Sequence, residues 1–305
     1  MRDPDDFFDT EPTYQLEKQE PYIEQATKSI EEFFSRRKTP FHFGQLKVLF
    51  ETQFFHITTT QAIYRLKDRG ILKTHQLHAG ANDVTFVFPA HLLKSTDTTK
   101  TLFTHMKSKA KIISLYDSPE ISKNLADHFE ALVKSELRAN NLKIISTHSN
   151  EYNGKKFHAS KANLDFIAEH PSGTAFGVQV KNELKSIEKY ELEVQLSICS
   201  DLQLRPVFIV RYMPFSFVHL IKQKQGLLLV IGNQLWPLGY KHLCDQIRSK
   251  MSISPTMVSG KLNKLAPKLR TAWPIEVRTD IPEVPAKHLN YWITTGKYPE
   301  RSSSN

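Results

Sequence analysis

The spacing of hydrophobic residues predicts a helical domain with a β-hairpin at the start of the chain. Apolar residues recur at helical intervals in two segments, and a third helix is expected to run from a threonine N-cap to a glycine stop. The expected helices are 21–38, 43–54 and Thr58–Gly70, and the expected strands are 71–74 and 84–88. Residues 20–90 are therefore predicted to form one domain.

The pattern in the middle of the chain predicts an α/β core over residues 118–240. The polar stretch 91–117 is expected to be a connector, and a helix is expected from its N-cap at Ser118 to about Ala139. The expected later elements are strands at 143–149, 163–168 and 176–181, a helix at 187–202 and a strand at 206–212. This order predicts a mixed sheet flanked by helices.

The charge of the chain is positive but unevenly distributed. The net charge is +9 and the isoelectric point is about 9.3, yet residues 1–20 contain seven acidic and two basic residues. Residues 1–19 are therefore predicted to be an acidic, flexible tail. The basic remainder suits a polyanionic partner such as nucleic acid.

Residues 241–305 are predicted to form a basic helical extension. One basic helix is expected at 240–250, and Ser254-Pro255 is expected to open another. Two interpretations of this extension stay open, a further surface for the polyanionic partner and a clamp on the core.

Three absences narrow the class of protein. No apolar run approaches the roughly 20 residues that a bilayer span needs, and the acidic N-terminus is unlike a secretory signal. Cys199 and Cys244 lack the spacing of a zinc site or a disulfide framework. A cytoplasmic protein without a membrane partner is therefore expected.

Asp165, Gln179 and Lys181 are predicted to share one face of a β-hairpin. Two apolar strands flank the turn 171–173, and a hairpin that is symmetric about Ser172 places Asp165 opposite Gln179. Lys181 follows two residues later and shares the face of Gln179. A carboxylate, an amide and an ammonium are costly to bury without a partner. Oxygen ligands of this kind favour a divalent metal ion.

The segment ITTTQAIYRLKDRGIL, residues 57–72, resembles the recognition helix of a winged helix-turn-helix module. The resemblance implies that this helix contacts DNA. Its expected outward face carries residue types that reach phosphates and base edges, namely Thr59, Thr60, Gln61, Tyr64, Arg65 and Lys67. The alternative is a solvated helix face in a winged helix that binds protein.

The motifs Phe129-Glu130, Asp165 and Gln179-Val180-Lys181, in that order, resemble the PD-(D/E)XK nuclease superfamily. The closest pattern is its Mrr-like restriction endonuclease branch, in which Gln-x-Lys replaces Glu-x-Lys. The resemblance covers residues 118–212, roughly a third of the chain. Leu164 stands where the superfamily often has the proline of the Pro-Asp pair.

This resemblance implies a restriction-endonuclease-like fold and a type II restriction enzyme that cuts double-stranded DNA. Mg²⁺, with Mn²⁺ as a substitute, would be held by Asp165, the Gln179 amide oxygen, the Val180 carbonyl and Glu130. Lys181 would hold the attacking water and the scissile phosphate. Hydrolysis of a phosphodiester needs such charge neutralisation and an activated water. The implied partners are DNA, a second copy of the chain and a cognate DNA methyltransferase.

Other roles for these residues stay open. Asp165 and Lys181 can form a structural ion pair, and Glu130 can pair with Lys134 four residues later. Asp127 competes with Glu130 for the role on the helix.

Two other functions also stay open, because Gln179 lacks the usual negative charge. One is a DNA-binding regulator with a degenerate nuclease core, and the other is a structure-specific resolvase or repair nuclease. His158, Lys161 and Gln195 are second-tier site candidates. The thirteen histidines show no paired ligand spacing, and the chain lacks GxxxxGK[ST], HExxH and GxSxG.

Overall fold

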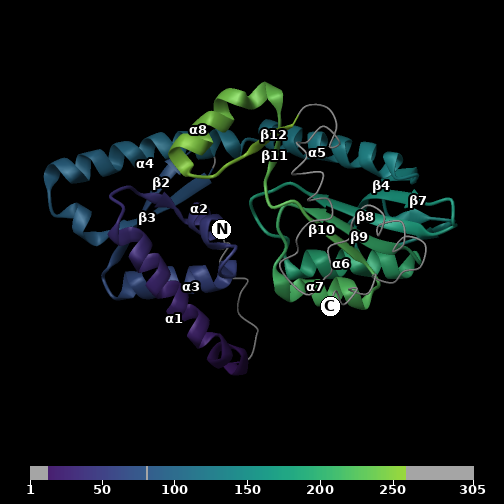
Figure 1. Ribbon diagram of the computed structural model, residues 1–305, viewed down its shortest axis with the longest axis horizontal. Coiled ribbons are helices and arrows are strands. Elements are labelled where there is room, and N and C mark those ends of the chain that lie inside the picture. The colour runs from purple at the N-terminus through teal and green to yellow at the C-terminus, as the bar shows by residue number, and fades with distance from the viewer. Residues whose placement is uncertain (1–12, 80–81, 259–305) are drawn as a thin grey trace, which may run out of the picture. The chain divides into compact units, whose positions relative to one another are not determined.

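The computed structural model describes residues 13–79 and 82–258, and its contacts divide the chain into two units (Figure 1). Unit 1 comprises Met1–Ser118 and Gln246–Ile253, and unit 2 comprises Pro119–Asp245 and Ser254–Asn305. Among the described residues, no helix is long and apolar enough to cross a membrane.

Unit 1 combines helices with a small antiparallel sheet. Its elements are α1 (Thr13–Ser35), β1 (Phe41–His42), α2 (Phe43–Phe50), α3 (His56–Asp68), β2 (Leu72–Ala79), β3 (Asn82–Pro89), a short 3-10 helix (Ala90–Leu93) and α4 (Thr96–Tyr116). The sheet order is β1-β3-β2. Helices α1, α2 and α3 bury apolar residues such as Ile30, Leu46 and Ile63 in one core with Val87 of β3.

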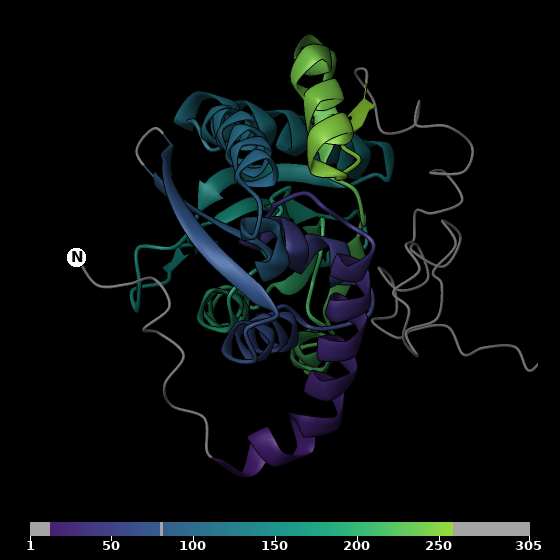
Figure 2. The same ribbon diagram turned by 90° about the vertical axis from the view of Figure 1, so that its left-hand side faces the viewer.

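Helix α3 begins earlier than the sequence predicts. Its N-cap is Phe55, and Thr58 and Thr59 lie inside the helix with buried side chains. The predicted threonine cap is therefore wrong, because these threonines pack inward instead of closing the helix end. The β2–β3 hairpin, the long blue ribbon in Figure 2, extends through Leu72–Ala79 and Asn82–Pro89, beyond the predicted strands.

The stretch predicted as a polar connector contains helix α4. This helix buries Leu102, Met106 and Ile113 at helical spacing. It also buries Lys109, whose ammonium donates a hydrogen bond of 2.6 Å to the carbonyl of Pro40. Burial lowers the pKa of Lys109 to about 8. The apolar spacing of this helix is hard to recognise in the sequence, because Lys109, a charged residue, occupies one of the inward positions.

Unit 2 contains a five-stranded mixed sheet between helices. Its elements are α5 (Pro119–Ala139), β4 (Lys143–Ser149), β5 (Glu151–Tyr152), β6 (Lys155–Lys156), β7 (Leu164–Glu169), β8 (Ala175–Lys181), α6 (Lys189–Asp201), β9 (Arg205–Val210), α7 (Phe215–Gln223), β10 (Leu227–Val230), β11 (Leu235–Pro237), a 3-10 turn (Leu238–Tyr240), the first part of α8 (Lys241–Met251) and β12 (Thr256–Val258). The strand order is β10-β9-β8-β7-β4. The predicted α/β class is confirmed.

Helices cover both faces of this sheet (Figure 1). Helix α5 packs Phe129 and Leu132 against Phe166 and Val178 on one face, while α6 and α7 cover the other. Strand β7 is antiparallel to β4 and β8, whereas β8, β9 and β10 are parallel.

Gly177 allows α6 to approach β8 closely. A Cβ atom at this position would lie 2.6 Å from Sγ of Cys199 on α6 and 2.8 Å from a methyl carbon of Leu164. Cys199 and Cys244 are both buried, and neither forms a disulfide. The helix therefore packs on the hydrogen-bonded hairpin with no room for a side chain at Gly177.

The segment near the C-terminal end of the described region differs from the prediction. Helix α8 matches the expected basic helix, but Thr256–Val258 is a strand parallel to β11. The helix predicted from Ser254-Pro255 is therefore wrong at its start, because these residues complete a small sheet. The rest of the predicted extension, 259–305, and residues 1–12 of the predicted tail lie outside the described residues.

Candidate metal centre

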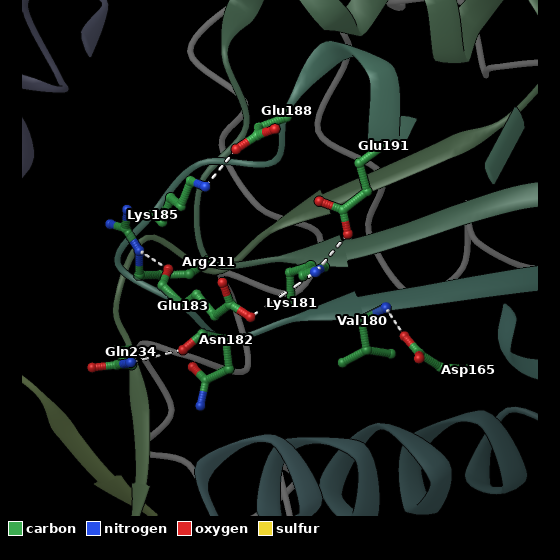
Figure 3. Close-up of polar contacts among 10 residues, drawn as sticks. All are labelled: Asp165, Val180, Lys181, Asn182, Glu183, Lys185, Glu188, Glu191, Arg211 and Gln234. Atoms are coloured by element: carbon green, nitrogen blue, oxygen red, sulfur yellow. Dashed lines mark hydrogen bonds and ion pairs between the residues drawn. The ribbon is translucent and has the colours of Figure 1, made fainter. Parts of the chain in front are cut away.

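Asp165 lies near the start of β7, where the pairing of β7 with β8 ends. The residue pairs between these strands are centred on Ser172, so the predicted hairpin register is confirmed. That register places Asp165 opposite Gln179 on β8. The carboxylate oxygen Oδ2 of Asp165 accepts a hydrogen bond of 2.6 Å from the backbone N–H of Val180 (Figure 3). The hairpin thus fixes the position of the carboxylate.

Glu130 and His148 converge on Asp165 from two other elements. Glu130 lies on α5 directly after the buried Phe129, and His148 lies on β4, the strand next to β7. One ligand atom from each of Glu130, His148 and Asp165 lies within 4.8 Å of the other two. Nε2 of His148 is 3.3 Å from Oε2 of Glu130. The predicted meeting of Glu130 with Asp165 therefore occurs in the structure, with an imidazole added.

Burial raises the pKa of Asp165 to about 7 from its ordinary value of 3.8. The hydrogen bond from Val180 and the charges of His148 and Lys181 act in the opposite direction, while the negative charge of Glu130 adds to the rise. Burial also raises the pKa of Glu130. The ionised forms of both carboxyl groups are thus poorly compensated by the described residues around them.

The two alternative partners of Glu130, Lys134 and Asp127, affect its pKa only through their charges. Lys134 lowers the pKa of Glu130 and Asp127 raises it, both by less than the effect of burial. The ion-pair distance of 3.3 Å belongs to His148. The structure therefore directs Glu130 toward Asp165 and His148.

The donor set of this group fits a divalent cation. Two carboxylates and an imidazole are common metal ligands, and a cation favours the ionised form of the acids that hold it. We call Glu130, His148 and Asp165 the candidate metal centre.

Lys181 is not a member of the candidate metal centre. Its ammonium lies 2.6 Å from Oε1 of Glu191 on α6 and 3.9 Å from Oε1 of Glu183. Figure 3 shows the ammonium turned toward Glu191, while the carboxylate of Asp165 is turned toward the amide of Val180. Burial acts to lower the pKa of Lys181, but the two glutamates and Asp165 outweigh it and the net shift is upward. Lys181 is therefore a protonated cation whose described ion pairs are with glutamates rather than with Asp165.

Gln179 is buried, and its amide oxygen accepts no hydrogen bond within the described part of the chain. The amide oxygen of Gln195 on α6 is also buried without a donor, while its Nε2 donates to the carbonyl of Asn163 at 3.3 Å. An unsatisfied buried carbonyl costs free energy. The amide oxygens of Gln179 and Gln195 are thus buried acceptors without a donor among the described residues. The side chains of the other two second-tier candidates, His158 and Lys161, are exposed.

The predicted DNA-contacting face of α3 is only partly exposed. Tyr64 and Lys67 are exposed, and Thr60 and Gln61 are half-buried. Thr59 is fully buried, so its predicted place on the outward face is wrong. Its position in the helix turns it toward the core of unit 1.

Arg65 of α3 is engaged by acidic residues of α1. Its guanidinium donates two hydrogen bonds of 2.6 Å to the carboxylate of Glu20, and Glu24 lies 3.9 Å away. Glu24 also lies 3.5 Å from Arg69. Arg65 and Arg69, two basic residues that could bind an anion, are thus paired with acidic residues of α1 in this structure.

His148 was missed from the sequence because it has no neighbouring ligand at a recognisable spacing. Its signal is the strand register. The pairs Thr147–Phe166 and Ser149–Leu164 flank it, so His148 and Asp165 occupy opposing positions on β4 and β7. Once Asp165 is suspected, the residue opposite it on the neighbouring strand is a candidate partner.

No protein-family model matches this chain, and no curated protein or solved structure is significantly similar to it. The arrangement of the chain's own residues is therefore the basis for its function.

Proposed function

We propose that this chain is a divalent-metal-dependent DNA endonuclease that hydrolyses phosphodiester bonds in double-stranded DNA. The observation that carries the proposal is the convergence of Glu130, His148 and Asp165 within 4.8 Å at the end of a β-hairpin. Half-buried acids with raised pKa values and an imidazole at one edge of a sheet are typical of functional sites. The net positive charge of the chain, +9, suits a polyanionic substrate.

The order of elements in unit 2 supports a PD-(D/E)XK-like core. Apart from the separate two-residue strands β5 and β6, the elements α5, β4, β7, β8, α6 and β9 follow the order of helix, three strands, helix and strand that the resemblance implies. Glu130 lies on the first helix, Asp165 at the start of one hairpin strand and Gln179 with Lys181 on the other.

The architecture of unit 1 supports a winged-helix module. Its helices α1, α2 and α3 precede a long hairpin, and a short strand between α1 and α2 joins the hairpin in one sheet. In this proposal α3 contacts DNA and the β2–β3 hairpin is the wing.

The residues of the candidate metal centre have separable roles. Glu130 and Asp165 would supply anionic oxygens to a cation, and His148 a neutral nitrogen. A bound divalent cation would supply Lewis-acid activation of water and neutralise charge on the phosphate. The N–H of Val180 fixes the orientation of Asp165. Lys181 would contact the scissile phosphate after leaving its pair with Glu191.

One observation favours a second candidate, a DNA-binding regulator without catalysis. Lys181 is held by Glu191 at 2.6 Å and by Glu183 at 3.9 Å, so its charge is compensated away from the candidate metal centre. A lysine that never leaves these glutamates would not contact a phosphate at Asp165.

The test is incubation of the purified full-length protein with plasmid and unmethylated phage DNA, with Mg²⁺, Mn²⁺ or EDTA. The variant Asp165→Asn removes the central charge and keeps an acceptor for the N–H of Val180. Asp201→Asn, an exposed position at the end of α6, is the matched control. DNA binding of each protein is measured in EDTA by fluorescence anisotropy.

The nuclease proposal expects metal-dependent cleavage by the wild type and Asp201→Asn. For Asp165→Asn it expects DNA binding that is at least as tight and a loss of cleavage. Discrete fragments would indicate a restriction enzyme, and a smear would indicate a nonspecific nuclease. Intact but bound DNA under all conditions would replace the nuclease with the regulator. Cleavage by Asp165→Asn at the wild-type rate would refute the assignment of the site.

A further inference from the structure

The backbone of His148 has an unusual conformation for a β-strand. Its φ angle is +48°, in the left-handed region, although it lies inside β4 between two residues paired with β7. Non-glycine residues in this region are strained. Asparagine, aspartate and histidine are the residues that tolerate it best. This conformation occurs at the residue that the register places opposite Asp165 and whose Nε2 lies 3.3 Å from Oε2 of Glu130.

The imidazole of His148 is exposed to solvent and lies close to the carboxylates of Glu130 and Asp165. The side chain of His148 is 61% exposed and that of Glu130 is 22% exposed, with 3.3 Å between Nε2 and Oε2. A ligand atom of His148 also lies within 4.8 Å of one from Asp165. A nitrogen donor therefore stands at the solvent side of two acidic groups, where an ion can enter.

We propose that the candidate metal centre takes a first-row transition-metal ion in preference to Mg²⁺, with His148 as the residue that sets this preference. The inference rests on the proposed function and specifies its cofactor. Mg²⁺ prefers oxygen ligands to nitrogen ligands. Imidazole suits transition metals, and the affinity of a mixed nitrogen and oxygen site rises from Mn²⁺ to Co²⁺. The imidazole nitrogen of His148 should therefore increase the difference in affinity between transition-metal ions and Mg²⁺, compared with a site made of the two carboxylates alone.

A histidine–glutamate ion pair without a metal is the competing explanation of the contact. It requires a protonated imidazole, whereas a metal ligand must be a neutral one. The ion pair explains the 3.3 Å distance, but it predicts no metal selectivity. Measured ion binding therefore separates the two.

The test measures metal binding by the full-length protein after removal of metal, without DNA. Mn²⁺ is followed by the electron paramagnetic resonance signal of the free ion, and Co²⁺ and Mg²⁺ by calorimetry. The variant is His148→Asn, because asparagine tolerates the left-handed backbone and lacks the imidazole. His158→Asn, an exposed histidine of the same unit, is the matched control.

We expect the wild type and His158→Asn to bind one ion with affinity rising from Mg²⁺ to Mn²⁺ to Co²⁺. In His148→Asn the affinity for Co²⁺ should fall at least about tenfold and that for Mg²⁺ less than about threefold. Equal affinity for the three ions, or no effect of His148→Asn on selectivity, would overturn this inference and leave the metal-dependent nuclease intact. Failure of the wild type to bind any of the ions at millimolar concentration would overturn both.

Discussion

Replacing Asp165 with asparagine should stabilise the metal-free protein at alkaline pH. The wild-type carboxyl group has its pKa raised to about 7, mainly by burial. In the unfolded chain the same group ionises near 3.8. Between these pH values the folded state holds a proton that the unfolded state has released. Stability therefore falls as the pH rises from about 4 to about 7, and the loss is complete above 7.

The size of this effect follows from the two pKa values. Each tenfold change in proton affinity is worth about 1.4 kcal/mol, so the rise from 3.8 to about 7 corresponds to at most about 4 kcal/mol. The site opens to solvent at His148, whose side chain is 61% exposed, and water screens part of the effect. After that discount we expect the variant to gain about 2 kcal/mol over the wild type between pH 4.5 and 8.5.

Urea unfolding followed by tryptophan fluorescence reports on unit 2 through Trp236, which is fully buried in that unit. Unfolding is measured in EDTA at pH 4.5 and 8.5 for the wild type, Asp165→Asn and the exposed control Asp201→Asn. A gain of about 2 kcal/mol moves the midpoint by roughly 1 M urea for an ordinary slope.

A stability difference that does not change with pH would contradict this prediction. If the difference between Asp165→Asn and the wild type is the same at both pH values, the carboxylate is not disfavoured in the folded state. The reasoning that a cation compensates Asp165 then fails. Metal added at 100 times its dissociation constant should stabilise the wild type by about 2.7 kcal/mol and the variant by much less.

Three further predictions concern other positions. Glu191→Gln should raise the single-turnover rate of DNA cleavage a few-fold by releasing Lys181, at a cost in urea stability of about 0–1 kcal/mol for a partly exposed pair; slower cleavage would mean that Glu191 positions the lysine. Gly177→Ala should destabilise unit 2 by about 1–3 kcal/mol because α6 packs directly on this backbone, and an unchanged urea midpoint would contradict that packing. Glu20→Gln should tighten duplex binding at low salt by about two- to fivefold because it releases Arg65, with the gain lost at high salt; equal anisotropy titrations of the variant and the wild type would remove α3 from the DNA interface.

The hairpin around Ser172 was predictable because its determinants are local. Two apolar runs and a turn fix the register, and the structure pairs the strands about that centre. Helix α5 was predictable for the same reason, since Ser118 and Pro119 mark its start and apolar residues recur every three or four positions. Elements whose signals lie within about ten residues are those that sequence patterns resolve best.

Helix α4 shows where periodicity fails. Its core residues include Lys109, which a sequence pattern counts as polar, although its ammonium reaches the carbonyl of Pro40. The long aliphatic part of a lysine can line a core while its end finds an acceptor. A lysine-rich helix with a buried lysine therefore looks like a connector until its tertiary contacts are known.

Side-chain direction limited the prediction of the site more than backbone register did. The register correctly placed Asp165 opposite Gln179, yet Lys181 pairs with Glu191 on α6, the helix that follows β8 in the chain. His148 likewise has a φ angle of +48° inside β4, which its sequence neighbours do not indicate. Neither a helix glutamate that captures a lysine nor a left-handed residue in a strand is written in a local pattern.

These two departures have a common electrostatic consequence. Glu191 and Glu183 form the ion pairs of Lys181, so its charge is compensated mainly away from Asp165. Burial and the charge of Glu130 raise the pKa of Asp165, and the N–H of Val180, His148 and Lys181 offset that rise only in part. A neutral imidazole cannot compensate two ionised carboxylates, and a protonated one compensates only one of them. Above pH 7 both ionised acids therefore carry negative charge that the group itself does not balance, and either Lys181 released from its glutamates or a bound cation would neutralise it. A bound cation would neutralise the acids without breaking the pair of Lys181 with Glu191, whereas a direct contact between Asp165 and Lys181 would break that pair.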